Sequence, residues 1–391
     1  MENPGSLFLR ASANGDFRSV KKLLAQGVDV NHRDEKGFTA LICSCESGHY
    51  DVSQHLISKG ANVNLSDNEN KSPIQYVSYH GYSKIVKLLL DSGADVNYPT
   101  ENGATALLAA CQEGKVECVR ILITGGADMH KSDTYGFFPL YQACSKGHEY
   151  VVDILLESGV NVNQTSSSGA SSLSMSSHEG HINITKQLIS KGADLNQRGK
   201  GGATPLHQAC GNNHFEIFQI LIDAGCNLDL ANDEGATLLF CFIVKGFTKM
   251  AELLMKSGCD IEQAITIKGR RLTPLQLAIN SNNTDIADLI TAEIKRRKKR
   301  ENDKARKKKK KKSNSNDNAN DNAIAIANDN DNANPKEMVE EEKIESIWSC
   351  SSCGQGLYSK IEINIPKFPL PIIIHEPALH HIFPLIKSPN R

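Results

Sequence analysis

The stretch Gly202-Ala203-Thr204-Pro205-Leu206-His207-Gln208-Ala209 is the clearest copy of a pattern that returns every 33 residues. A glycine recurs in its phase at Gly37, Gly103, Gly136, Gly169, Gly202 and Gly235, and Asn70 fills the one missing place. Asn is the side chain that best tolerates the left-handed backbone conformation for which glycine is normally required, so the exchange has a physical meaning. A fixed period between about 20 and 50 residues indicates a repeat array, and the period therefore decides the architecture.

Two further glycine series keep the same period. One runs through Gly15, Gly48, Gly81, Gly114, Gly147, Gly180 and Gly246, with Asn213 as its exception, and the other runs from Gly27 to Gly258. The second of these follows an apolar stretch each time and suits helix C-terminal caps. Each unit also carries two short helical patterns, such as 40–46 and 51–59. Neither can enclose its own apolar face, so neighbouring units must stack and share a core.

The chain resembles an ankyrin-repeat protein, whose unit reads roughly Asp-x-x-Gly-x-Thr-Pro-Leu-His, then Gly-His, then Leu-Leu and Gly-Ala-Asp-Val-Asn. The quoted copy continues with His214, Leu221-Ile222 and Gly225, and the resemblance covers residues 5–295. It implies an all-α solenoid of about nine units, each a helix-turn-helix with a β-hairpin loop. In the Val-Asn step the asparagines resemble the turn-stabilising asparagine of the family; they are Asn31, Asn64, Asn97, Asn163 and Asn196.

The resemblance also sets the expected domain boundaries. We expect an N-terminal capping unit over 1–33, seven repeats over 34–265 and a C-terminal capping unit over 266–294. Terminal units of repeat proteins are atypical because they cap the stack. Thr237 and Thr273 are 36 residues apart where 33 is the period, so about three residues are inserted around 264–271. We expect this insertion to lengthen one hairpin.

Cysteine and histidine occupy fixed places in the unit. One place in the first helix holds Cys45, Cys111, Cys144 and Cys210. The first place of the second helix holds His49, His148, His181 and His214. We expect the cysteines to be small buried core residues with reduced thiols, and the histidine rings to bond the turn backbone.

No catalytic or nucleotide-binding motif is recognisable, so we expect a chain that is not an enzyme and needs no cofactor. In the family, partners are bound by the hairpin tips and the inner face of the first helix, on a concave surface. Carried onto this sequence, the resemblance implies partner-binding positions at Phe38, Tyr79, His80, Glu101, Glu113, Tyr135, Phe137 and Lys146. Exposed aromatic rings are the usual energetic anchors of an interface, although these rings could instead pack against neighbouring hairpin tips.

After the array the composition changes abruptly. Residues 295–312 hold 14 Lys/Arg against two acids, a net charge of +12 that the whole-chain charge of −1 conceals. Residues 313–346 form a low-complexity linker rich in Asn, Asp and Ala. We expect both to be disordered, with the basic run extending the last helix by some turns before charge repulsion frays it. Candidate targeting residues are Lys295, Arg296, Arg297, Lys298, Lys299, Arg300, Lys307, Lys308, Lys309 and Lys310.

The basic run has three readings: a nuclear-import signal read by an import receptor, which we favour, a patch for nucleic acid or anionic membrane, and a solvated charge block. The tail, 347–391, has no recognisable fold. Its Cys350, Cys353, His375 and His380 have the ligand count of a zinc site. However, 21 residues separate Cys353 from His375, more than the roughly 12 to 15 of a Cys-Cys-His-His finger, so we expect no metal.

The leading functional hypothesis is a non-catalytic adaptor that binds proteins on its concave face. The alternatives are a substrate-recruiting component of a ubiquitin-ligase-type complex and a nuclear, nucleic-acid-associated regulator acting through the basic run. Hydrophobic residues at 39% exclude a membrane-embedded chain, and no apolar run approaches the roughly 18 residues of a membrane span. The opening residues lack a signal-peptide pattern, so we expect the cytoplasm and/or the nucleus, and no small-molecule substrate.

Overall fold

A computed structural model of the chain describes residues 3–267 and 270–316. The described residues form two compact units, one ending at Glu234 and the other beginning at Gly235. The linker expected at 313–346 lies almost wholly outside the described residues, and the tail at 347–391 lies outside them entirely.

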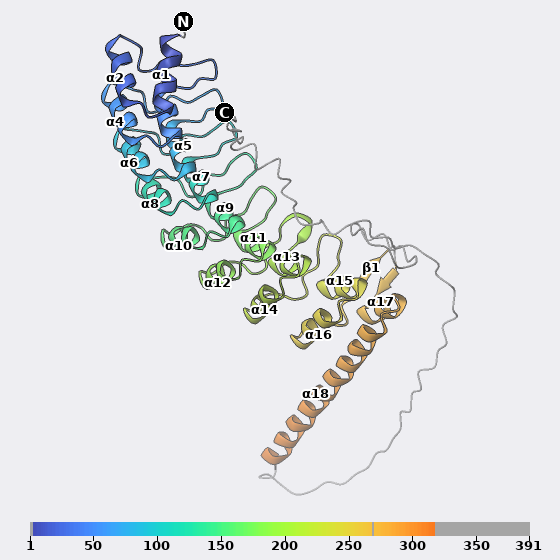
Figure 1. Cartoon of the computed structure of the whole chain (residues 1–391). Coiled ribbons are helices and arrows are strands. Elements are labelled where there is room, and N and C mark those ends of the chain that lie inside the picture. The colour runs from blue at the N-terminus through green and yellow to red at the C-terminus, as the bar shows by residue number, and fades with distance from the viewer. Residues whose placement is uncertain (1–2, 268–269, 317–391) are drawn as a thin grey trace, which may run out of the picture. The chain divides into compact units, whose positions relative to one another are not determined.

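The first unit is built from helix pairs in two layers (Figure 1). The first helix of each pair lies in one layer: α1 (Pro4–Ala13), α3 (Ala40–Glu46), α5 (Pro73–His80), α7 (Ala106–Gln112), α9 (Pro139–Lys146), α11 (Ser172–Glu179) and α13 (Pro205–Gly211). The second helices form the other: α2 (Phe17–Ala25), α4 (Tyr50–Ser58), α6 (Ser83–Asp91), α8 (Val116–Thr124), α10 (Glu149–Glu157), α12 (Ile182–Ser190) and α14 (Phe215–Asp223). A short 3-10 turn, η1 (Lys200–Gly202), precedes α13. The loops between pairs project on the side of the first helices.

Each first helix begins at a side-chain cap. The hydroxyl of Thr105 accepts the backbone N–H of Leu108 at 3.2 Å, which satisfies one of the donors that a helix start leaves open. At α5 the amide oxygen of Gln75 returns the favour by accepting the backbone N–H of Ser72 at 2.7 Å. The Thr-Pro-Leu signal in the sequence therefore marks where a helix starts.

The Gly-His step links neighbouring units. Gly114 ends the turn with φ 65°, and a Cβ at this residue would lie 2.6 Å from the ring of His148 in the next unit. The Nε2–H of that ring donates to the carbonyl of Gln112 at 2.9 Å. His49, His181 and His214 bond the carbonyl 36 residues earlier in the same way, which confirms the predicted backbone-bonding role. Only glycine satisfies both the backbone conformation and the close approach.

Asparagine does replace glycine where the sequence suggested it. Asn70 and Asn213 have φ of 59° and 61°, and Asn282 occupies the same turn in the last unit with φ 54°. The three are the positive-φ residues other than glycine among the described residues.

A ladder of asparagine side chains ties the units together along the turn after each second helix. The side chain of Asn97 donates to the carbonyl of Gly126 at 3.2 Å and accepts the N–H of Asp128 at 2.8 Å, and Asn31, Asn64 and Asn163 repeat this pair of bonds. His130 stands where the next asparagine would be. There the bridge is made instead by Gln164, whose amide donates to the carbonyl of His130 at 2.8 Å.

The core holds the cysteines as expected. All nine cysteines of the described residues are free and buried, including the four that share a place in the first helix. Burial raises the pKa of the Cys45 thiol to about 12. Their role is packing, since a buried thiol behaves as a small apolar group.

The second unit contains α15 (Leu238–Lys245), α16 (Thr248–Lys256), α17 (Pro274–Asn280) and α18 (Thr284–Asn316). Between α16 and α17 lie β1 (Ile265–Ile267) and β2 (Arg270–Leu272), an antiparallel pair in which Thr266 faces Arg271. This strand pair falls at the predicted insertion and confirms the lengthened hairpin. The helix that was expected to fray after 294 instead continues through the whole basic run as part of α18.

Candidate protein-binding surface

The hairpin loops and the first helices of the first unit form one face, which we call the hairpin face (Figure 1). Three of its loops open with Asp34, Asp67 and Asp133. Each carboxylate accepts the backbone N–H groups two and four residues further on, at 2.8 to 2.9 Å. Neighbouring loops are also joined through their backbones, as by the N–H of Thr134 and the carbonyl of Asn102 at 2.9 Å. The loop side chains are therefore presented in a fixed order.

An aromatic stack connects the surface to the core at α9. The ring of Phe137 lies 6.1 Å from Tyr135 and 5.2 Å from Tyr141, with interplanar angles of 27° and 9°. Tyr135 is 42% exposed, Phe137 is half-buried and Tyr141 is 1% exposed. Burial raises the pKa of Tyr141, whose hydroxyl has no hydrogen-bond partner among the described residues. The stack thus presents one exposed ring on a rigid support.

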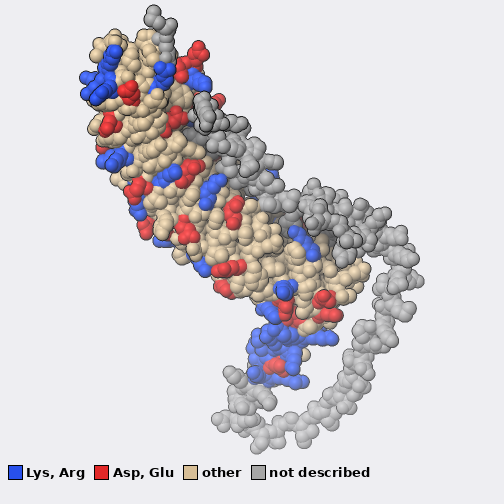
Figure 2. Space-filling model, in the orientation of Figure 1, with Lys and Arg blue, Asp and Glu red and all other residues tan. Residues whose placement is uncertain are grey.

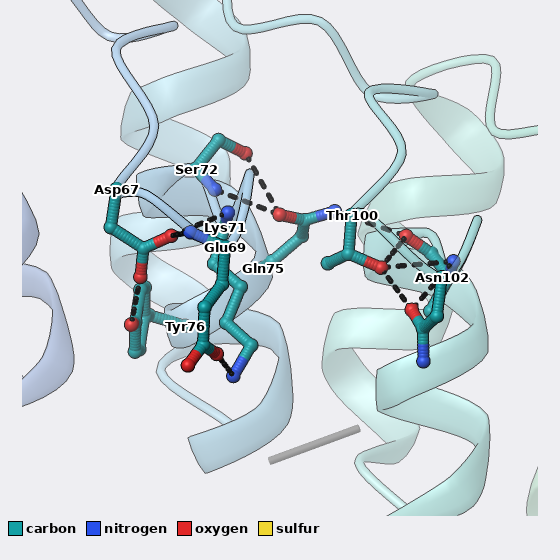
Figure 3. A network of polar contacts seen from close by, with 9 residues as sticks. Asp67, Glu69, Lys71, Ser72, Gln75, Tyr76, Thr100 and Asn102 are labelled. Carbon is teal, nitrogen blue, oxygen red and sulfur yellow. Dashed lines mark hydrogen bonds and ion pairs between the residues drawn. The ribbon is translucent and has the colours of Figure 1, made fainter. Parts of the chain in front are cut away.

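A polar network lies two units earlier, around α5 (Figure 3). The hydroxyl of Tyr76 donates to Oδ2 of Asp67 at 2.6 Å, and the ring of Tyr76 lies 5.9 Å from that of Phe38. The amide of Gln75 donates to the carbonyls of Tyr98 and Ala104 at 2.9 and 3.1 Å. The network therefore joins a hairpin loop, its own helix and the next unit.

The same network contains a buried ion pair. Nζ of Lys71 lies 2.7 Å from a carboxylate oxygen of Glu69, and Lys71 is 4% exposed. Burial, followed by the charge of Asp67, raises the pKa of nearby Glu46, while Lys71 opposes that rise. Acidic groups outnumber the one lysine here, so the network makes a locally negative part of the hairpin face.

The ends of α5 and α7 bring three predicted residues together. The rings of Tyr79 and His80 meet edge to face at 5.1 Å. Burial raises the pKa of Tyr79, and the charge of Glu113 adds to that rise. Burial and Lys115 lower the pKa of His80, and Glu113 opposes them. Tyr79, His80 and Glu113 therefore share one environment.

The remaining predicted residues are placed singly. Glu101 is exposed at a hairpin tip and Lys146 is exposed at the end of α9, while Phe38 is half-buried against Tyr76. The predicted positions thus form a Tyr79 group and a Tyr135 group with isolated residues between. Their role in partner binding stays a prediction.

Sequence reasoning missed Asp67, Lys71 and Tyr76. The signal was available in the register of the repeat. The place of Lys71 holds Phe or Ala in the copies 38, 104, 137, 170 and 203, and no other copy has an aromatic residue at the place of Tyr76. Two simultaneous departures from a repeat at adjoining places indicate side chains that serve one another.

Two of the candidate targeting residues are engaged within the second unit. The guanidinium of Arg297 donates to the carbonyls of Met255 and Cys259 at 3.0 and 2.9 Å, and to Glu293 at 3.0 Å. Arg296 also pairs with Glu293, at 2.6 Å. Arg297 therefore fastens α18 to the end of α16, where unpaired carbonyls favour a cation.

The candidate zinc ligands Cys350, Cys353, His375 and His380 lie outside the described residues. Within the part of the chain that is described, three or more potential metal ligands nowhere come together. A search of the same residues for a membrane-spanning helix of sufficient length and apolar character finds none.

Helix pairs of period 33, joined by hairpin loops and stacked through Gly-His and asparagine contacts, define a helical repeat solenoid. The chain belongs to the ankyrin-repeat family: the family model for ankyrin repeats matches residues 8–100, 98–166 and 173–265. Two ankyrin repeat proteins of Rickettsia felis are each 43% identical over 44 residues, which is 11% of this chain and 70% and 67% of those proteins. Ankyrin repeats are protein–protein interaction modules, and the family is generally non-catalytic.

Proposed function

We propose that the chain is a non-catalytic adaptor that binds a partner protein on the hairpin face, with Tyr135 as the central anchor. The observation that carries this is the aromatic stack: Tyr135 is an exposed ring held by Phe137, which in turn stacks on buried Tyr141. An exposed tyrosine that is already held in place loses little conformational entropy when it is buried by a partner. Tyrosine is also among the residues enriched at interface hot spots.

The surroundings of Tyr135 support a protein partner. Glu101 on a neighbouring hairpin and Lys146 at the end of α9 are both exposed, so both signs of charge occur on the same face. An apolar centre with a mixed polar rim is the usual composition of a protein interface. The rigid backbone links between loops fix the spacing of these groups.

The test replaces Tyr135 by p-benzoylphenylalanine in the full chain and irradiates the protein in cell lysate. Tyr150 provides a matched control, because it is 78% exposed and lies on α10 in the layer of second helices. We expect a discrete crosslinked protein from position 135 that is absent from position 150. Equal crosslinking from both positions would show that the hairpin face has no preferred role.

The crosslinked partner then allows a binding measurement. Tyr135→Ala should weaken its affinity by about 30-fold, which corresponds to a hot-spot loss of roughly 2 kcal/mol. Tyr150→Ala should leave the affinity unchanged. Phe137 is retained in both variants because its contact with Tyr141 also stabilises the fold. An unchanged affinity for Tyr135→Ala would remove the anchor from the proposal.

A further inference from the structure

The end of α18 stands apart from the rest of the second unit. Ile286 and Ile290 are buried, and Arg297 makes the last printed contacts with α16. Every residue from Lys298 to Lys308 is exposed. The helix continues to Asn316, so the segment Lys298–Asn316, which we call the basic arm, extends about 28 Å at 1.5 Å per residue.

Positive charge surrounds the basic arm. Residues 298–308 contain seven Lys or Arg and two acids, and four more lysines follow at 309–312. Successive helical residues are about 100° apart, so Lys298, Arg300 and Lys304 already point in three different directions. Figure 2 shows Lys and Arg gathering over α18, whereas the surface of the first unit mixes both signs. Ala305 is the one apolar residue between 298 and 312.

The acids stabilise the helical form of this segment. Glu301 and Asp303 stand three or four residues from cations on both sides, at spacings that bring helical side chains together. The fastening of Arg297 holds the first turn of the arm to α16. These two features explain why a helix persists where repulsion alone would favour an extended chain.

We propose that the basic arm binds double-stranded DNA by lying in the major groove and contacting the phosphates of both strands. The major groove is about 12 Å wide and admits an α-helix. A helix in the groove has a phosphate strand on each side, which matches cations distributed around the whole circumference. Because the side chains are Lys and Arg with almost no other contacts to offer, binding is independent of base sequence.

The geometry of the arm distinguishes DNA from other polyanions. A helix that binds an anionic membrane presents an apolar stripe to the lipid, and this segment has none. The major groove of double-stranded RNA is too deep and narrow to admit a helix. An import receptor that grips an extended chain would have to unwind the arm.

The first experiment measures binding of the full chain to a fluorescein-labelled 30-base-pair DNA of mixed sequence by fluorescence anisotropy, between 50 and 200 mM NaCl. Each phosphate neutralised contributes about −0.9 to the slope of log K against log salt, so about five contacts predict a slope near −4.5. Two unrelated DNA sequences should bind within about twofold of each other. A slope near zero would overturn the proposal.

A pair of charge-matched variants tests the location of the binding. Lys or Arg is changed to Gln in the arm at positions 298, 299, 300, 304, 306, 307 and 308, and the control changes seven exposed lysines of the repeats at positions 36, 59, 84, 87, 186, 191 and 249. The arm variant should bind at least tenfold more weakly with a shallower salt slope, and the control should stay within about twofold. Equal losses in both variants would show that net charge alone is responsible. Far-ultraviolet circular dichroism and thermal unfolding of both variants check that the repeats remain folded.

A further variant separates helix from charge. Ala305→Pro keeps every charge but removes a backbone donor and clashes with the preceding turn, so it interrupts the arm in its middle. We expect at least a fivefold loss of affinity for duplex DNA and little change for single-stranded DNA of the same length. Unchanged duplex affinity would refute binding as a helix in the groove.

The same titration with double-stranded RNA, and with vesicles containing 30% phosphatidylserine, decides between polyanions. Duplex DNA should bind most tightly at 150 mM NaCl. Tighter binding to the vesicles would identify the arm as a membrane-surface segment, and tighter binding to RNA would exclude the major-groove geometry; either result overturns the proposal.

Discussion

The hydroxyl of Tyr76 lies 2.6 Å from Oδ2 of Asp67, so a residue of α5 is bonded to the aspartate that organises the preceding hairpin loop. The other oxygen of the same carboxylate accepts the backbone N–H groups of Glu69 and Lys71. One carboxylate therefore holds the loop in shape and fixes it to its helix.

Tyr76→Phe should destabilise the second repeat by about 1.5 to 3 kcal/mol, because a hydrogen bond to a charged group is lost while its acceptor remains buried. Amide hydrogen exchange in residues 67–76 should accelerate accordingly. Tyr150→Phe is the control, since Tyr150 is exposed and its hydroxyl can be replaced by water contacts. Equal exchange in Tyr76→Phe and the unmodified chain would mean that the bond contributes nothing.

Arg297→Gln should loosen α18 from α16. The substitution removes hydrogen bonds to two backbone carbonyls and to Glu293, and we expect a local loss of about 1 to 3 kcal/mol, seen as faster exchange at the end of α16 and in residues 284–300. Arg296→Gln, which removes an exposed pair with the same glutamate, should have little effect. Comparable effects from the two variants would contradict the fastening role of Arg297.

The stability of the first unit should fall in mild acid through His207. Burial, with a contribution from Arg198, lowers the pKa of His207 from 6.5 to about 4. Between these values the unfolded chain binds more protons than the folded one, so this stabilisation is complete above pH 6.5 and is lost as the pH falls towards 4. The total effect is about 3 kcal/mol.

His207→Gln isolates this contribution. Gln75 already occupies the equivalent place in an earlier unit, where its side chain bonds the backbone. Thermal unfolding of both proteins from pH 7 to pH 4 should show a steeper loss for the unmodified chain. Parallel curves would exclude His207 as the titrating group.

The nine cysteines of the repeats should resist alkylation at pH 7.5 until the chain unfolds. Burial raises the pKa of Cys118 and of Cys226 to about 11, so the thiolate that reacts is scarce as well as inaccessible. Iodoacetamide labelling followed by peptide mass spectrometry should find little modification in the native state. In guanidinium without reductant all nine should react, and a shortfall would reveal disulfide bonds.

The repeat period was predictable because it follows from local requirements. Gly114 is needed for a left-handed turn and for the approach of His148, and both needs recur wherever units stack. Asn70 and Asn213 could be anticipated for the same reason. The strand pair around Thr266 followed from counting residues between equivalent threonines.

The site was less accessible to sequence reasoning. Whether Phe137 anchors a partner or supports a neighbour depends on which ring it stacks against, and that distance is set by packing between units. The length of α18 was underestimated because composition reports the repulsion among lysines but not the contact of Arg297 with the carbonyls of α16. Long-range contacts of this kind are invisible to a local pattern.

The asparagine ladder makes the length of this protein a quantity counted in whole periods. Asn97 contacts Gly126 and Asp128, and Asn163 makes the same contacts with the unit that follows it, so every bond has the same offset. Excision of residues 98–130 would join Asn97 to Lys131 and put it in the place of His130. The shortened chain would then carry an asparagine at the one step where the ladder is interrupted, so that a deletion of 33 residues would repair a connection where a deletion of 32 would break all that follow.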